Sequence, residues 1–151
     1  MEAATPSPSS CPIGRLSDII GDRWTILILR DLFNGVRRFD ALQKSLGISK
    51  KILSQRLARL VESELLIRTP YQERPLRHEY RLTIKGRDLF PVLVSMQRWS
   101  NRWLFSEGET TTELVHLECG ETLDARLTCG HCNGAVTPAR VKAVRRPKRE
   151  Q

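Results

Sequence analysis

The stretch that decides the fold is GISKKILSQRLARL, at residues 47–60. Its apolar residues Leu53, Leu57 and Leu60 recur at three- and four-residue spacing, so one side of a helix here requires a hydrophobic core. The opposite side of the same helix is polar and carries Lys51, Gln55 and Arg59. The role of this second face is the first functional question that the sequence raises.

The residues around this stretch predict two helices joined by a tight turn. A short helix over about 39–46 precedes it, with Phe39 and Leu42 directed inward. Gly47 can adopt the left-handed conformation that ends this helix, and Ser49 can cap the next one, which runs to about residue 64. Two helices joined by a short turn that contains Gly form a helix-turn-helix.

The flanking segments complete the expected fold. A first helix is expected over 13–21 and ends at Gly21. A second helix begins at Asp22 and runs to Asn34-Gly35. Apolar residues almost encircle this second helix, which predicts that it is central and buried. The alternating segments 65–72 and 78–83 flank ERPLR and predict a β-hairpin with a charged tip. A long helix over 84–105 follows, with a mild kink at Pro91. The fold class is therefore mainly α with a small β-hairpin (α+β), a winged helix-turn-helix.

Composition and charge favour a polyanionic partner. The 151-residue chain carries a net charge of +8, more than half of it in the segment 139–151. We expect a disordered N-terminus at 1–10, a DNA-binding and dimerisation domain at 11–105, a linker and small appendage at 106–138, and a basic disordered tail at 139–151. Neither a secretion signal nor a run of apolar residues long enough for a membrane span is evident, so a cytoplasmic location is expected. No internal repeat is evident.

The polar face of the second helix suits double-stranded DNA. A helix-turn-helix inserts the first half of its second helix into the major groove, where Gln can pair with adenine and Lys or Arg with guanine. Arginines on the hairpin and before the first helix can neutralise flanking phosphates. The expected DNA contacts are Arg37, Arg38, Ser49, Lys50, Lys51, Ser54, Gln55, Arg59, Arg74 and Arg77.

Several motifs together resemble the HxlR-type transcriptional regulators. They are Cys11-Pro12, GDRWT at 21–25, RRFDAL at 37–42, LSQRLARL at 53–60, EYRLT at 79–83 and Gly86. The resemblance covers about residues 11–105, and it implies a homodimer that binds a pseudo-palindromic operator as a repressor or an activator. One departure is Glu64, where the family commonly has Gly, so the helix end is expected to close in another way.

The family resemblance implies that the first and last helices of the domain form the dimer interface. Two tryptophans on one side of a terminal helix support this, because so small a domain has little surface with which to cover them. The expected interface residues are Leu16, Ile20, Leu93, Met96, Trp99 and Trp103. The space between the first, last and central helices could hold a small-molecule effector, although no polar cluster singles out a pocket.

The single Cys11 stands directly before the helical domain. Some relatives in the resembled family use a thiol here to sense electrophiles or oxidants, and Arg15 and a helix N-terminus would both favour the thiolate. The alternative is a small, inert residue.

The C-terminal cysteines predict a structural zinc site. His116 and Cys119, and likewise Cys129 and Cys132, are separated by two residues, a spacing that lets two donors bend onto one tetrahedral zinc ion. His131 competes with His116 as the fourth ligand. A redox dithiol at Cys129 and Cys132, or unligated thiols, are the alternatives.

The sequence also bears on two other classes of function, an enzyme and a binding module. An enzyme is not expected, because the sequence lacks a phosphate-binding Gly loop, a nucleophile elbow and a close His–acid pair. A zinc-containing module that binds protein or RNA, with only non-specific affinity for DNA, is the main alternative to a sequence-specific regulator.

Overall fold

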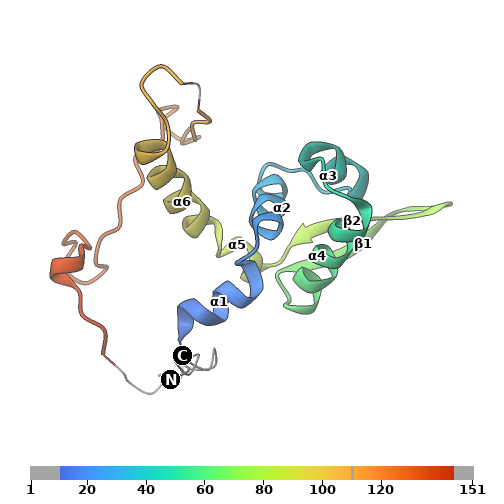
Figure 1. Cartoon of the computed structure of the whole chain (residues 1–151), viewed down its shortest axis with the longest axis horizontal. Helices are drawn as coiled ribbons and strands as arrows, with labels where there is room; N and C mark the ends of the chain where they lie inside the picture. Colours follow the sequence, from blue (N-terminus) through green and yellow to red (C-terminus); the bar gives the residue numbers. More distant parts are fainter. Residues whose placement is uncertain (1–10, 110, 145–151) are drawn as a thin grey trace, which may run out of the picture. The chain divides into compact units, whose positions relative to one another are not determined.

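The computed structural model describes residues 11–109 and 111–144 (Figure 1). Its elements are α1 (Pro12–Ile20), α2 (Arg23–Phe33), α3 (Phe39–Leu46), α4 (Lys50–Glu62), β1 (Leu66–Glu73), β2 (Leu76–Leu82), α5 (Ile84–Arg87), α6 (Phe90–Trp103) and the 3-10 helix η2 (Pro138–Arg140). The chain divides into two compact units, Met1–Trp99 and Ser100–Gln151. The expected disorder of residues 1–10, and of the tail beyond 144, falls outside the described residues.

Helix α2 is the centre of the first unit, as its apolar pattern predicts. Ile28 and Leu29 are fully buried, and α2 packs against α1, α3, α4 and β2. On α4, Leu53, Leu57 and Leu60 are at most 1% exposed. The predicted apolar face of α4 is therefore confirmed, and its burial leaves the polar face outward.

Asp22 starts α2 as the sequence predicts. Its carboxylate accepts hydrogen bonds from the backbone N–H groups of Trp24 (3.0 Å) and Thr25 (3.1 Å), and from the Thr25 hydroxyl. Arg56 of α4 forms an ion pair with the same carboxylate at 3.1 Å. Burial raises the pKa of Asp22, but the bonds from Thr25, the charge of Arg56 and the bond from Trp24 together lower that pKa below its ordinary value. This carboxylate therefore both caps α2 and ties it to α4.

The turn between α3 and α4 has the predicted geometry. Gly47 adopts the left-handed conformation (φ 61°), and its N–H donates to the carbonyl of Gln43. The Ser49 hydroxyl accepts the N–H of Ile52 at 3.3 Å and caps α4. Ile48 between them is only 3% exposed, so the turn is anchored in the core.

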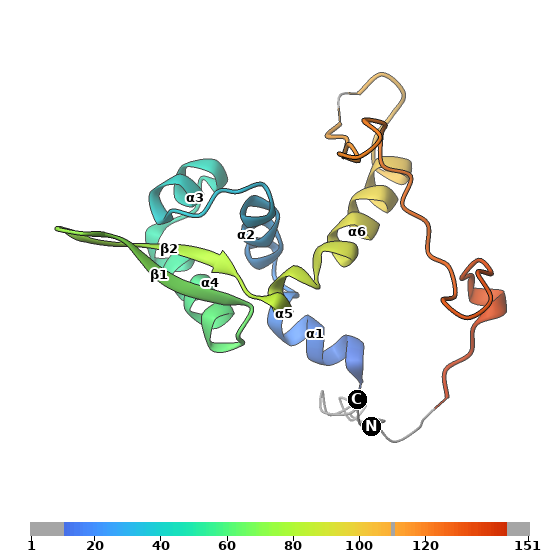
Figure 2. The same ribbon diagram turned by 180° about the vertical axis from the view of Figure 1, so that it is seen from behind.

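Strands β1 and β2 form an antiparallel hairpin, the wing. It pairs Leu66 with Leu82 at its base and Glu73 with Leu76 at its tip, with a register shift around Tyr71. The wing projects from the helices of the first unit, with α4 beside its base (Figures 1 and 2).

A third segment pairs with the wing. Arg38, just before α3, forms an antiparallel bridge with Glu79 of β2, and the N–H of Tyr80 donates to the carbonyl of Arg37 at 2.8 Å. Because the partners are some 40 residues apart in the sequence, alternation within the hairpin alone does not reveal this contact. The bridge fixes the wing to the start of the helix-turn-helix.

The expectation of one long helix over 84–105 with a mild kink is wrong. Helix α5 ends at Arg87, two turn residues follow, and α6 begins at Phe90. Pro91 is the cause, because it has no N–H for the carbonyl of Arg87 and its ring would collide with that carbonyl. In the first turn of a new helix, Pro91 is tolerated. Within the described part of the chain, no helix is long and apolar enough to cross a membrane.

The end of α4 also differs from the expectation at Glu64. Glu64 itself adopts the left-handed conformation (φ 60°). Its N–H donates to the carbonyl of Val61, and the N–H of Leu65 donates to that of Leu60, both at 3.0 Å. These two bonds form the Schellman motif that usually has Gly at this position, so no other closure is needed.

Two short hairpins organise the described part of the second unit. The first hairpin (114–123) contains an isolated bridge between Val115 and Thr122, and the second hairpin (127–136) contains one between Thr128 and Ala135. No residue in the described ranges 100–109 and 111–144 is buried. The second unit therefore lacks a hydrophobic core among these residues.

The left-handed Glu64 generates a stability prediction. A non-Gly residue in this conformation is strained by about 1–2 kcal/mol, part of which Gly regains at the expense of chain entropy. We expect Glu64→Gly to raise the free energy of unfolding by about 0.5–1 kcal/mol, because the exposed pair with Lys85 contributes little. Urea denaturation followed by circular dichroism measures the change.

The matched control is Glu62→Gly, two residues earlier within α4. There the backbone is helical, so Gly is expected to lower the free energy of unfolding by about 1 kcal/mol. Destabilisation by both substitutions would contradict the strain assigned to Glu64.

Candidate nucleic-acid interface

The exposed face of α4 carries the residues that the sequence assigns to DNA. The exposed side chains on this helix include Lys50, Lys51, Ser54, Gln55 and Arg59. Lys50 and Lys51 lie one turn before Ser54 on the same side of the helix. The burial of the leucine face against the core therefore holds these polar groups at the surface.

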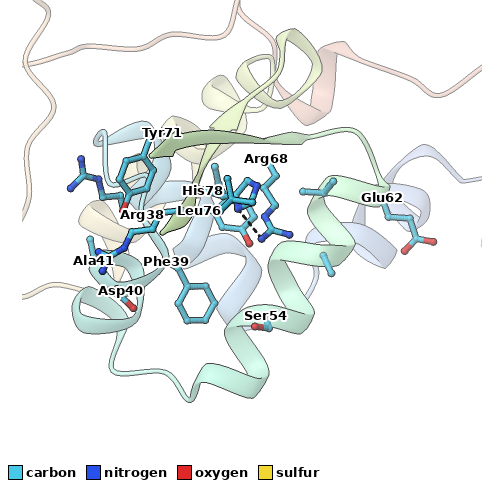
Figure 3. Close-up of a pocket in the computed structure, with 14 residues that line it drawn as sticks. Arg38, Phe39, Asp40, Ala41, Ser54, Glu62, Arg68, Tyr71, Leu76 and His78 are labelled. Carbon is cyan, nitrogen blue, oxygen red and sulfur yellow. Dashed lines mark hydrogen bonds between the residues drawn. The ribbon is translucent and has the colours of Figure 1, made fainter. Parts of the chain in front are cut away.

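A groove of about 1060 Å³ lies between α4, the start of α3 and the wing. Ser54, Ala58 and Glu62 line it from α4, while Arg68 and Arg77 line it from the wing (Figure 3). The small side chains of Ser54 and Ala58 leave the helix backbone accessible. Lys50, Lys51 and Gln55 are not among its lining residues, and they extend the polar surface along α4 beyond the groove.

Two side-chain contacts hold arginines in place at this groove. The Arg68 guanidinium lies 3.0 Å from Nδ1 of His78 on the neighbouring strand (Figure 3). The Arg38 guanidinium lies over the ring of Tyr71, 4.3 Å from its centroid. Such contacts restrict the arginine side chain before it binds, so less conformational entropy is lost when it contacts a phosphate.

The remaining predicted contacts lie in different surroundings. Arg37 and Arg74 are exposed but do not line the groove, and Arg74 occupies the tip of the wing. Arg59 is exposed, yet its guanidinium donates to the carbonyl of Asp18 in α1 at 3.0 Å. Arg59 therefore links α4 to α1 in this structure.

This arrangement can serve two kinds of contact with a duplex. Arg38, Arg68 and Arg77 can meet phosphates, whereas the exposed side of α4 can present donors and acceptors to base edges. The carboxylates of Asp40 and Glu62 also line the groove, so its surface is not uniformly basic. A groove that carries both charge signs favours a ligand bound in one orientation over non-specific binding of any polyanion.

Sequence reasoning missed the positioning roles of Tyr71 and His78. Their signal is weak, because each occupies an ordinary place in a strand where a packing role is the usual expectation. The cation–π contact and the Arg68–His78 contact depend on the register of the wing and on its bridge to Arg38. Only the tertiary pairing brings these side chains together.

The expected dimer residues divide into buried and exposed sets. Ile20 is 6% exposed and belongs to the core of the first unit, against which Leu16 and Leu93 also pack. Met96, Trp99 and Trp103 are 44%, 58% and 63% exposed and recur on one side of α6. An apolar stripe on α6 is therefore open in the single chain.

Cys11 is exposed and occupies the N-cap position of α1. Its carbonyl accepts the N–H of Arg15 at 3.0 Å, while its thiol makes no capping bond. A reagent in solution can therefore reach this sulfur.

The predicted zinc ligands lie in the two hairpins of the second unit. His116 and Cys119 are close, with Nδ1 3.4 Å from Sγ. Hydrogen bonds from the backbone N–H groups of His131 and Cys132 lower the pKa of the Cys129 thiol. Within residues 11–109 and 111–144, no three His, Cys, Asp or Glu side chains form a group that could hold a metal ion. The four predicted ligands are thus not brought together here, and the zinc site stays a prediction.

A helix-turn-helix followed by a wing that shares a groove with the second helix defines the winged helix-turn-helix class of DNA-binding domains. Comparison with known proteins identifies the family within this class. The chain belongs to the HxlR-like helix-turn-helix family, which matches residues 19–108. The resemblance read from its motifs is thereby confirmed.

Similar proteins carry regulator names. An uncharacterized HTH-type transcriptional regulator of Mycobacterium tuberculosis is 46% identical over 129 residues, or 85% of this chain and 82% of the relative. The crystal structure of PA1607, a candidate transcription factor, is 38% identical with a TM-score of 0.84, and the match covers 91% of this chain and 96% of that one. The reduced form of the regulator YodB from Bacillus subtilis is 34% identical with a TM-score of 0.54, covering 62% and 93% of the two chains.

The wing arginines generate a prediction about DNA affinity. Arg77→Ala is expected to weaken binding to all duplexes alike and to reduce the slope of log K against log salt by about 0.9, the effect of one lost phosphate contact. Fluorescence anisotropy with a labelled duplex between about 50 and 200 mM salt covers the range in which this slope is measurable.

The matched control is Arg87→Ala, which removes an exposed arginine of α5 outside the groove. It should leave the slope unchanged. An equal loss in both variants would indicate that overall charge, and not the groove, sets the affinity.

Proposed function

We propose that the chain is a sequence-specific transcriptional repressor that binds an inverted-repeat operator as a homodimer. The observation that carries this proposal is the polar face of α4, held outward beside the groove by the burial of Leu53, Leu57 and Leu60. The relatives reported above are named as transcriptional regulators, which supports a regulator over an enzyme. Such a protein would act in the cytoplasm, where bacterial DNA lies.

The first half of α4 supplies the proposed base contacts. Gln55 can form two hydrogen bonds with adenine, and Lys50 or Lys51 can reach guanine. Ser54 and Ala58 are small enough to admit a base edge close to the helix. Wing arginines then hold the register by phosphate contacts that carry little sequence information.

The apolar stripe on α6 supports a second copy of this chain as the partner. Met96, Trp99 and Trp103 leave a contiguous apolar face in water, and a homodimer would bury it. Two-fold symmetry would place two copies of α4 about one turn of DNA apart, which requires an inverted repeat. Repression would follow where a dimer that covers both half-sites excludes other proteins from them.

Selection of bound sequences from a random duplex pool tests the operator proposal. The parent chain should enrich an inverted repeat, and Gln55→Ala should lose discrimination by about 1–3 kcal/mol at one base pair of each half-site. The control Gln97→Ala removes the same type of side chain from α6 and should keep the parental motif. A chain that ends at Phe105 should also keep the motif.

The same selection tests the dimer. Trp99→Glu places a charge on the apolar stripe and should enrich single half-sites. Ile84→Glu, at an exposed apolar residue of α5 that does not line the groove, should still enrich an inverted repeat. An absence of any enriched motif, with binding that disappears in the chain ending at Phe105, would favour the zinc-containing protein- or RNA-binding module instead.

We also propose that Cys11 makes binding responsive to thiol-reactive compounds. The exposed sulfur lies at the start of α1, and α1 is linked to α4 through the carbonyl of Asp18 and Arg59. A bulky adduct on Cys11 would disturb this helix and with it the position of α4. The similar protein YodB has been crystallised in a reduced and a diamide-treated form.

Alkylation experiments test the role of Cys11. Treatment with N-ethylmaleimide should lower operator affinity of the parent by at least about fivefold, the low end of allosteric coupling energies. Cys11→Ser should resist the treatment, while Cys119→Ser should respond as the parent does. If Cys11→Ser loses affinity to the same extent as the parent, Cys11 is not the sensor.

A further inference from the structure

The two hairpins of the second unit are copies of one backbone motif, offset by 13 residues. In the first hairpin, the N–H of His116 donates to the carbonyl of Glu121 and the N–H of Gly120 donates to that of His116. In the second hairpin, the corresponding bonds join the N–H of Cys129 to the carbonyl of Gly134, and the N–H of Asn133 to the carbonyl of Cys129.

The match extends along both hairpins. In the first hairpin an outer hydrogen bond joins the N–H of Leu123 to the carbonyl of Leu114. In the second hairpin the corresponding bond joins the N–H of Val136 to the carbonyl of Leu127. The isolated bridges, and the left-handed residues Gly120 (φ 73°) and Asn133 (φ 54°), also correspond at this offset. The ten-residue segments share only two identical residues, a Leu and a Cys, so the repeat is hidden in the sequence.

The repeat aligns the predicted ligands in pairs. His116 corresponds to Cys129, and Cys119 corresponds to Cys132, each pair flanking the tight turn of its hairpin. His131 corresponds to Glu118, which is not a ligand position. The repeat therefore favours His116 as the fourth ligand over His131, a choice that the spacing alone leaves open.

The second unit also needs a source of stability other than a core. No side chain of residues 100–109 and 111–144 is buried, and Val115, Leu117 and Leu127 are all more than half exposed. Small units without a core usually depend on a disulfide or a structural metal ion. All four cysteines are free, so their sulfurs are available as ligands for a metal cross-link.

We propose that the two hairpins together bind one structural zinc ion through His116, Cys119, Cys129 and Cys132. Three thiolates and one imidazole complete a tetrahedral site, and binding releases the three thiol protons to solvent. Nine residues separate Cys119 from Cys129, and this segment spans up to about 30 Å when extended, so both hairpins can reach a common ion. The ion would join the two hairpins.

Elemental analysis of the full-length chain, purified in reducing buffer without chelator, tests the site. The parent should contain about one zinc per chain, and the zinc content of Cys119→Ser, Cys132→Ser and His116→Gln should fall by at least about tenfold. The matched controls His131→Gln and Cys11→Ser should retain the parental content. Less than half an equivalent in the parent, or zinc lost from His131→Gln and kept by His116→Gln, would overturn the assignment.

Limited proteolysis gives a second readout that does not depend on DNA binding. Arg126 lies between the hairpins, and zinc should shield the bond after it from trypsin. Chelation should accelerate this cleavage by at least about tenfold in the parent and leave it unchanged in Cys119→Ser. Equal cleavage of the parent with and without chelator would contradict a metal-linked pair of hairpins.

Discussion

The packing of α4 against α2 is the constraint on which the rest of the first unit depends. Leu53, Leu57 and Leu60 are buried among residues that include Ile28 and Leu29, and full burial of each such side chain contributes about 1.5–3 kcal/mol. A rotation of α4 about its axis would expose these leucines and bury Lys51 or Gln55 without partners. Hydrophobic burial thus determines which residues of α4 face solvent. The candidate functional surface consists of the residues that this burial leaves exposed. The ion pair between Arg56 and Asp22 adds a polar link between the same two helices.

The wing acquires its position from contacts that are distant in sequence. A two-stranded hairpin is only marginally stable alone, and this one is anchored by the buried Leu66 and by the bridge between Arg38 and Glu79. At the wing's base, Thr83 donates to the carbonyl of Glu64, and Gly86 leaves room for the carbonyl of Leu65, which a Cβ would approach to 2.2 Å. The groove between wing and α4 is therefore a product of these anchors as much as of the strands themselves.

The two units are stabilised by different physical means. The first unit has a continuous apolar core, so its stability arises from burial. The second has no buried residue among those described, and its regular features are backbone hydrogen bonds within two hairpins. Since hydrogen bonds exposed to water contribute little net free energy, a cross-link between the hairpins is the physically reasonable complement. This contrast explains why the candidate DNA-binding surface can be understood from packing, whereas the proposal for the appendage is argued from ligand chemistry.

By itself, the sequence determined the local features of the chain. Periodicity and capping residues located the helices, the turn at Gly47 and the hairpin, because these depend on interactions between near neighbours in the chain. The motif pattern likewise identified the family. Tertiary structure alone decided the left-handed Glu64, the bridge to Arg38 and the pairing of Arg68 with His78. It also revealed the repeated hairpins, whose shared hydrogen bonds are made by backbone atoms and are therefore compatible with different side chains. These features depend on contacts between distant segments, or on backbone geometry that several residue types can adopt, and neither leaves a periodic signal in the sequence.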